Sequence, residues 1–137
     1  MDCIYCGSKT GVSNSRQQKK ANQIWRRRRC TSCKAVFSTL EGVDLGRSVA
    51  IDKDGRLEPF SREKLLLSVF SACGHRKDAM ECSTALTGTI VGKILAGHNS
   101  PLLKSDDIVS VTSAVLKRFD RAAYVQYNAY HPLHGTK

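Results

Sequence analysis

Apolar residues in the second half of the chain recur every three or four positions, which is the spacing of amphipathic helices. Three stretches show this pattern, over residues 61–74, 78–97 and 105–119. A fourth stretch, 120–131, carries alanine and tyrosine at helical spacing, although its composition also allows a strand. The pattern predicts a bundle of three or four helices.

Polar residues that favour helix ends bound these stretches. Ser61 has the position of an N-cap, and Asp78 and Glu81 have the spacing of a capping box. Two acidic residues open the third stretch, at the positive end of the helix dipole, and Asp120 is placed to cap the fourth. Glycines follow the first two stretches, as is common at helix C-termini.

The first third of the chain alternates with the period of two that strands show. Short strands are predicted over Val12–Ser15, Ile24–Cys30 and Ala35–Glu41, with Arg16–Gln23 as an exposed basic loop. A further pair of strands is predicted around residues 49–58, because Asp54-Gly55 is a strong hairpin signal between two apolar runs.

Composition changes near Gly42–Arg47, which suggests two domains. We expect an α+β chain with a strand-based N-terminal module over residues 1–45 and a domain of hairpin and helices over 46–131. Residues 132–137 are expected to form a flexible tail.

Two Cys-x-x-Cys pairs frame the N-terminal strands, Cys3 with Cys6 and Cys30 with Cys33. Each pair can place two thiolates about 2.3 Å from one Zn²⁺, which predicts a zinc ribbon. Free thiols or disulfides are the alternative. The N-terminus lacks the layout of a signal peptide, so we expect an intracellular protein with reduced thiols. Four thiolates close the metal's coordination shell, so the zinc is expected to be structural.

The net charge of +10 is concentrated in the N-terminal module. Residues 1–48 have ten Lys and Arg against three Asp and Glu, whereas residues 49–137 have twelve against nine. Arginine is suited to contacts with phosphate and with guanine edges, so the module is predicted to bind nucleic acid rather than only to present a solvated surface. Trp25 could pack or stack on a base. The candidate DNA contacts are Arg16, Lys19, Lys20, Arg26, Arg27, Arg28 and Arg29.

Cations also cluster around the second hairpin and the first long helix, at Lys53, Arg56, Arg62 and Lys64. A turn beside a helix N-terminus could bind a phosphate chain. The alternative is that these side chains are simply solvated, as most charged residues at turns are.

No arrangement typical of catalysis or membrane insertion is present. The sequence has no Walker loop, no His-Glu-x-x-His and no Gly-x-Ser-x-Gly motif, so we do not expect an enzyme. It also lacks the roughly 18 consecutive apolar residues of a membrane helix. Cys73 and Cys82 fall on apolar helical faces and are interpreted as core residues. The histidines have no ligand spacing and are interpreted as surface or loop residues.

Five motifs follow one another in an order that resembles one bacterial family. They are Val12–Arg16 for V-x-D-S-R, Ile24–Cys33 for I-R-R-R-R-x-C-x-x-C, Phe37–Glu41 for F-T-T-x-E, Glu58–Leu65, and Asp120–Val125 for the start of D-x-V-A-Y-x-R-F. The chain resembles NrdR-type transcriptional repressors of ribonucleotide reductase genes, which join a zinc ribbon to an ATP-cone. The resemblance covers residues 1–131.

This resemblance implies an ATP-cone with ATP and dATP as effectors, a homo-oligomer whose size changes with the nucleotide, and repression through double-stranded operator DNA in the bacterial cytoplasm and nucleoid. It also implies nucleotide contacts. Ala72-Cys73 and Arg76 match the end of the cone's first helix. The candidate contacts are Ile51, Lys53, Arg56, Glu58, Arg62, Lys64, Arg76 and Tyr124.

The chain departs from the family at three places. Trp25 takes the first arginine position of the basic block, Asp52 stands where a nucleotide-contacting lysine is expected, and Gln126 and Tyr127 replace Arg-Phe. Either Lys53 substitutes for the missing lysine through a local shift, or nucleotide affinity is changed. The alternative function is therefore a zinc-ribbon adaptor for DNA or protein with weakened or lost nucleotide sensing.

Overall fold

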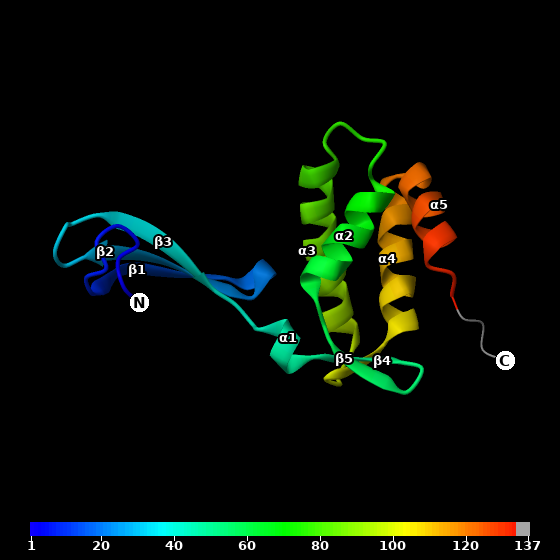
Figure 1. Ribbon diagram of the computed structural model, residues 1–137, viewed down its shortest axis with the longest axis horizontal. Coiled ribbons are helices and arrows are strands. Elements are labelled where there is room, and N and C mark those ends of the chain that lie inside the picture. The colour runs from blue at the N-terminus through cyan, green and yellow to red at the C-terminus, as the bar shows by residue number, and fades with distance from the viewer. Residues whose placement is uncertain (134–137) are drawn as a thin grey trace. The chain divides into compact units, whose positions relative to one another are not determined.

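The computed structural model describes residues 1–133 and divides the chain into two compact units, Met1–Val43 and Asp44–Lys137 (Figure 1). Each unit has its own core, so each is described by itself. The division falls close to the change in composition. Most of the tail predicted over 132–137 lies outside the described residues. The assignment of a separate function to each unit stays a prediction.

The N-terminal unit is a three-stranded antiparallel sheet in the order β1-β2-β3. Its strands are β1 (Thr10–Gln18), β2 (Gln23–Cys30) and β3 (Val36–Glu41). Its core cluster contains only three buried residues, Cys3, Cys30 and Phe37. A core this small cannot stabilise a fold alone, so the cysteine site must supply much of the stability.

The predicted strands are confirmed, but β1 is longer than predicted. Residues 16–18 pair with the start of β2, where the sequence predicted a loop. Residues 16–18 form strand rather than loop because a short 3-10 turn, Lys19–Ala21, closes the hairpin, with Asn22 at a left-handed φ of 48°. A register shift between Val12 and Asn14 forms a β-bulge around Ser13.

The second unit begins with a short helix, α1 (Leu45–Ser48), which Asp44 caps. Next come the hairpin strands β4 (Ala50–Lys53) and β5 (Arg56–Pro59), which confirm the predicted hairpin. A third strand, β6 (Leu102–Lys104), lies parallel to β4, so the sheet order is β5-β4-β6. Neither α1 nor β6 was predicted.

Four helices pack beside this sheet (Figure 1). They are α2 (Arg62–Ala72), α3 (Ala79–Gly97), α4 (Ser105–Phe119) and α5 (Arg121–Tyr130). The fourth stretch is thus a helix, and the strand alternative is excluded. The core contains residues from every helix and from β6, among them Val69, Ile90, Leu103, Leu116 and Tyr127. Fully burying one such aliphatic side chain contributes about 1.5–3 kcal/mol.

The helix caps agree with those predicted from the sequence, except at α3. Ser61 accepts a hydrogen bond from the Lys64 amide, and Asp120 accepts from the amides of Ala122 and Ala123. The capping box predicted for Asp78 and Glu81 is wrong, because the Asp78 carboxylate makes no cap hydrogen bond. It is instead bonded to neighbouring side chains, as described below.

Candidate functional sites

Four cysteine thiols meet at one end of the N-terminal sheet. The first two lie in the turn before β1, Cys30 ends β2, and Cys33 lies in the next turn. All four sulfur atoms lie within 4.8 Å of one another. The Cys3–Cys33 and Cys6–Cys30 sulfur pairs are 3.7 and 3.5 Å apart. A tetrahedral zinc with bonds of about 2.3 Å would separate its sulfurs by about 3.8 Å, so these residues fit a zinc ion.

Each Cys-x-x-Cys segment is a tight turn that aims both sulfurs inward. The Cys3 amide donates to the Ser8 carbonyl at 2.7 Å, and the Cys30 amide donates to the Ala35 carbonyl at 2.9 Å. Gly7 and Lys34 take up left-handed φ values of 72° and 63° just after the two pairs. A Lys in that conformation is uncommon, so the turn geometry is imposed by its surroundings.

The surroundings of Cys6 and Cys33 shift the pKa values of these two thiols in opposite directions. Hydrogen bonds from Ser8 lower the pKa of Cys6 to about 6. The Ala35 amide also favours the thiolate of Cys33, but the neighbouring thiol of Cys6 and burial outweigh it and raise the pKa of Cys33 to about 12. A divalent metal bound between the sulfur atoms would favour their thiolate form. Within residues 1–133 this is the one cluster of His, Cys, Asp and Glu that could hold a metal, and neither Cys73 nor Cys82 belongs to it.

The four consecutive arginines lie on β2 and divide between the two faces of the sheet. Side chains alternate along a strand, so Arg26 and Arg28 share one face with Cys30. Both have partners on β3: Arg26 pairs with Glu41, and Arg28 Nε donates to Thr39 Oγ1 at 3.3 Å. Both are partly buried. These two guanidinium groups therefore help to hold β3 on β2.

Arg27 and Arg29 point to the opposite face and are exposed. Neither guanidinium group has a hydrogen-bond or ion-pair partner within residues 1–133. Arg16 is directly opposite Trp25 in the β1–β2 register, so both belong to this second face. We call Arg16, Trp25, Arg27 and Arg29 the basic face. Lys19 and Lys20 are exposed in the turn that joins β1 to β2.

The second unit has a pocket of about 290 Å³ beside its hairpin. Its wall comes from β4, β5, the first half of α2, the start of α4 and the end of α5. Four of the predicted nucleotide contacts line it: Ile51, Lys53, Glu58 and Lys64. Lys64 Nζ lies 3.5 Å from Glu58 Oε2 across the junction of β5 and α2. The structure therefore brings half of the predicted set together.

The other four predicted contacts do not line the pocket. Arg56 is exposed at the start of β5, opposite Lys53. Arg62 is exposed at the start of α2 and leans toward Gly88 of α3. Tyr124 is half-buried against the core, with Lys117 Nζ 5.7 Å from its ring centre.

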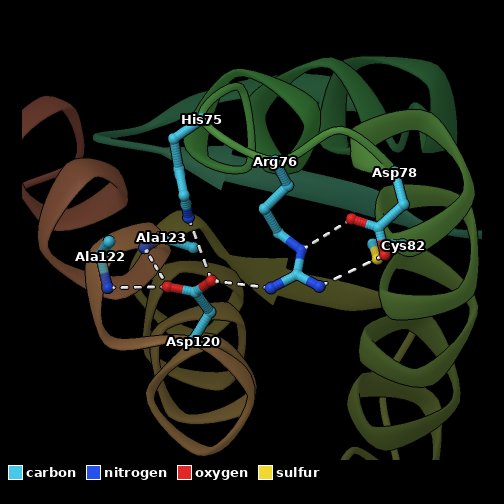
Figure 2. A network of polar contacts seen from close by, with 7 residues as sticks. All are labelled: His75, Arg76, Asp78, Cys82, Asp120, Ala122 and Ala123. Atoms are coloured by element: carbon cyan, nitrogen blue, oxygen red, sulfur yellow. Dashed lines mark hydrogen bonds and ion pairs between the residues drawn. The ribbon is translucent and has the colours of Figure 1, made fainter.

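Arg76 has the clearest alternative role, because its guanidinium is bound to two carboxylates (Figure 2). Arg76 Nε donates to Asp78 Oδ1 at 2.9 Å and Nη1 donates to Asp120 Oδ2 at 3.0 Å. The His75 ring lies 3.0 Å from the same Asp120 oxygen, and Cys82 donates to Asp78. This network joins the α2–α3 loop to the α4–α5 junction.

The network holds its carboxylates in the ionised form. Hydrogen bonds from His75, from the Ala123 amide and from Arg76 keep the pKa of Asp120 well below its usual range. Hydrogen bonds from Arg76 and Cys82 lower the pKa of Asp78 to about 2. The interpretation of His75 as a surface or loop residue is confirmed, and its contact with Asp120 is an addition that the sequence did not predict.

Asp52 does not face the pocket. Ile51 and Lys53 line it, and the alternation of β4 sends the side chain between them the other way. The Asp52 carboxylate instead accepts a hydrogen bond from the Gly55 amide at 2.7 Å, which closes the hairpin turn. The acid that the sequence placed near a triphosphate is thus a turn residue.

Several pocket residues were not predicted. They lie at the start of α4 and the end of α5, and they include Ser105, Asp106, Tyr127, Tyr130 and His131. No motif marks them, because they are far in sequence from the hairpin. The tyrosine spacing at 124–130 was the available signal, but it was interpreted only as a helical stripe.

Comparisons with known proteins cover nearly the whole chain. A family model described as "Transcriptional repressor NrdR-like, N-terminal domain" matches residues 1–41. Curated proteins named "Transcriptional repressor NrdR" align over 93% of this chain. The protein of Pelotomaculum thermopropionicum is 36% identical and is covered over 76% of its length. Those of Symbiobacterium thermophilum and Streptococcus pneumoniae are 33% and 34% identical and are covered over 84% and 81%. Within the described residues no helix is long and apolar enough to cross a membrane.

Proposed function

The chain belongs to the NrdR family of transcriptional repressors, and from this premise we propose how its two units divide the work. The zinc ribbon binds double-stranded operator DNA of ribonucleotide reductase genes. The second unit binds ATP or dATP in the pocket beside the hairpin, and the bound nucleotide changes the oligomeric state of the protein. The protein acts in the bacterial cytoplasm, on the nucleoid.

The basic face is the observation that supports DNA binding by the ribbon. Arg27 and Arg29 are exposed and their guanidinium groups have no partner within residues 1–133, so these groups are free to bind phosphate or base edges. Arg26 and Arg28 are occupied by β3 and are expected to contribute less. The Cys₄ site holds the ends of the strands that present these side chains, and it has no open position for catalysis.

The pair of variants Arg27→Ala/Arg29→Ala and Arg26→Ala/Arg28→Ala tests this division. We would measure binding to duplex DNA from a ribonucleotide reductase promoter by fluorescence anisotropy over a range of salt concentrations. Each lost phosphate contact lowers the slope of log affinity against log salt by about 0.9, so the first variant should lower it by about 1.8. The second variant should change it much less. Zinc content and circular dichroism report whether each variant still folds, and a larger loss for the second variant would contradict the assignment.

The pocket supports nucleotide binding by the second unit. Lys53 and Lys64 supply positive charge, and the N-terminus of α2 lies at the same wall, with Ser61 as its cap. Apolar and aromatic side chains at the other side of the pocket, such as Ile108 and Tyr130, suit a purine ring.

Calorimetric titration with ATP and with dATP tests this proposal. Lys64→Ala is expected to weaken binding by about tenfold, as loss of one charge-assisted hydrogen bond costs about 1.5–3 kcal/mol. Arg62→Ala is the matched control, because Arg62 is on the same helix but does not line the pocket. Size-exclusion chromatography with light scattering, with no nucleotide, with ATP and with dATP, tests the change in oligomer size. Equal masses in all three conditions would refute it.

The alternative is an adaptor that has lost nucleotide sensing, and it was motivated by Asp52. The Asp52 carboxylate bonds to the hairpin turn and Lys53 lines the pocket, so this departure gives the alternative little support. Absence of any binding of ATP and dATP would favour the adaptor.

A further inference from the structure

His131 follows the last turn of α5 and is held in one orientation. Its Nδ1 lies 3.1 Å from the Tyr127 carbonyl oxygen. A carbonyl only accepts hydrogen bonds, so Nδ1 carries the proton and Nε2 is the free nitrogen of the neutral ring. The ring also stacks on Tyr127, with centroids 4.3 Å apart and planes at 12°. Tyr127 is 3% exposed, so the imidazole rests on a fixed surface.

The His131 side chain is part of the pocket wall. His131 lines the pocket together with Lys53, Lys64 and Glu58 on the opposite elements. Within residues 1–133, Nε2 has no hydrogen-bond or ion-pair partner. A nitrogen that is oriented but unpaired can bind a ligand without first breaking another contact.

The charges around the pocket explain why such a nitrogen is needed. The lining residues that carry a formal charge at neutral pH are Lys53 on β4, Glu58 on β5, Lys64 on α2 and Asp106 on α4, which are two cations and two anions. Lys64 is also close to Glu58. The phenols of Tyr127 and Tyr130 complete the titratable groups of the lining. A ligand with several negative charges therefore meets little net positive charge unless His131 becomes protonated.

We propose that His131 Nε2 contacts a phosphate of the bound nucleotide and takes up a proton when it does so. This inference rests on the proposed binding of ATP or dATP. The neutral ring offers only a lone pair at Nε2, whereas the imidazolium offers an N–H to a phosphate oxygen. Nucleotide affinity should therefore rise as the pH falls from 8 to 6, with a limit of about tenfold per pH unit for one linked proton.

Two substitutions test the roles of the two ring nitrogen atoms separately. His131→Asn keeps an amide N–H near the position of Nδ1, which can still bond the Tyr127 carbonyl, but it has nothing at Nε2. His131→Gln places a donor near Nε2 that does not titrate. We expect the Asn variant to bind ATP several-fold more weakly at pH 6 and to lose the pH dependence. The Gln variant should keep affinity at pH 8 but gain little at pH 6.

The decisive measurement is proton uptake on binding ATP, obtained by calorimetry in two buffers of different ionisation enthalpy at pH 7. ATP itself can take up protons, so the difference between the wild type and His131→Asn isolates the residue. His98→Asn is the matched control, because His98 makes the same ring contact with the Ile94 carbonyl, at 3.0 Å, yet lies outside the pocket. We expect on the order of half a proton less uptake for His131→Asn and no change for His98→Asn.

Equal uptake by the wild type and His131→Asn would overturn the inference and leave nucleotide binding intact. An equal loss of uptake in the His98 variant would also overturn it. If the wild type binds neither ATP nor dATP, the proposed nucleotide function fails, and this inference fails with it.

Discussion

In the hairpin, the direction in which a charged side chain points decides whether it lines the pocket. Asp52 and Lys53 are neighbours in sequence, but only Lys53 lines the pocket. In a sequence alignment, Asp52 occupies the position where the family is expected to have a lysine. The pleat of the strand turns Lys53 toward the pocket and Asp52 away from it. The hydrogen bond from the Gly55 amide holds Asp52 in the hairpin turn.

Removal of the Asp52 carboxylate should therefore affect stability rather than nucleotide binding. Asp52→Ala loses the hydrogen bond to the Gly55 amide and should lower the free energy of unfolding of the second unit by about 0.5–1.5 kcal/mol. Asp52→Asn retains an acceptor oxygen and serves as the control. Urea denaturation followed by the helical circular dichroism signal measures the change. A many-fold gain in ATP affinity for either variant would mean that the carboxylate faces the ligand.

The arginine block shows the limit of residue-level prediction in the ribbon. The alternation of side chains along a strand places Arg26 and Arg28 on one side and Arg27 and Arg29 on the other. The sequence could not show which side has partners, because Glu41 and Thr39 reach β2 only through the pairing of β3. Arg16 joins the basic face only because of the bulge around Ser13, which shifts the alternation of β1.

At the scale of elements, the long helices and the hairpin were predictable and the shortest elements were not. Helices α2 to α5 have enough turns to show a stripe of apolar residues, whereas α1 has four residues and β6 has three. Such short segments have no measurable period, and their structure depends on a partner. Pairing with β4 makes a strand of Leu102–Lys104.

The hairpin turn between β4 and β5 requires residues with positive φ. Asp54 and Gly55 have φ values of 54° and 85°, which is the combination of a type I′ turn. Gly55→Ala should destabilise the second unit by about 1 kcal/mol, because no atom lies within 4 Å of the added Cβ and only the backbone conformation is penalised. Asp54→Gly should be neutral or stabilising. Chemical denaturation would show the pair of opposite effects, and an unchanged Gly55→Ala variant would contradict this turn geometry.

The polar network at the α4–α5 junction, which contains Asp78 and Asp120, should make the second unit sensitive to acid. The pKa values of Asp120 and Asp78 are lowered in the folded protein, so their contribution to stability is present above the ordinary carboxyl pKa of about 3.9. It is lost as the pH falls through about 2, where Asp78 titrates, and lower still for Asp120. Melting temperatures between pH 7 and pH 2 should fall steeply for the wild type below pH 4.

Asp120→Asn is the informative variant for this junction. It should melt at a lower temperature than the wild type at pH 7, and the difference should shrink as the pH falls below about 3.9, because the carboxyl of the unfolded wild type takes up a proton there while that of the folded protein does not. Glu81→Gln changes an exposed acid in the first turn of α3 and is the control. A constant difference across the whole pH range would show that the ionised form of Asp120 is not what stabilises the junction.

At the scale of the whole molecule, the division into two units predicts that zinc supports only one of them. The ribbon has three buried core residues and depends on its metal, whereas the second unit has a core of its own. Chelation of zinc should abolish DNA binding and leave the helical circular dichroism signal and the thermal melt of the second unit almost unchanged. ATP binding should survive chelation. Joint loss of both signals would show that the units do not fold independently.

The zinc ligands could be predicted from the sequence because they come in two local pairs, each within one turn. Half of the pocket could not, because α4 and α5 contribute to it through packing over a long stretch of chain. The family resemblance was enough to single out Ile51, Lys53 and Glu58, which line the pocket. It could not indicate that His131, after the last helix, lines the same pocket.

The parallel pairing of β4 with β6 has a consequence for the order in which the pocket forms during folding. The β4–β5 hairpin is closed by a local turn and can form within microseconds. The β4–β6 pairing must wait until α2 and α3 have brought the chain back, because closing so long a loop is entropically costly. Only then does the start of α4 reach the hairpin. The newly made chain should therefore acquire the pocket beside the hairpin late, after most of its helices exist.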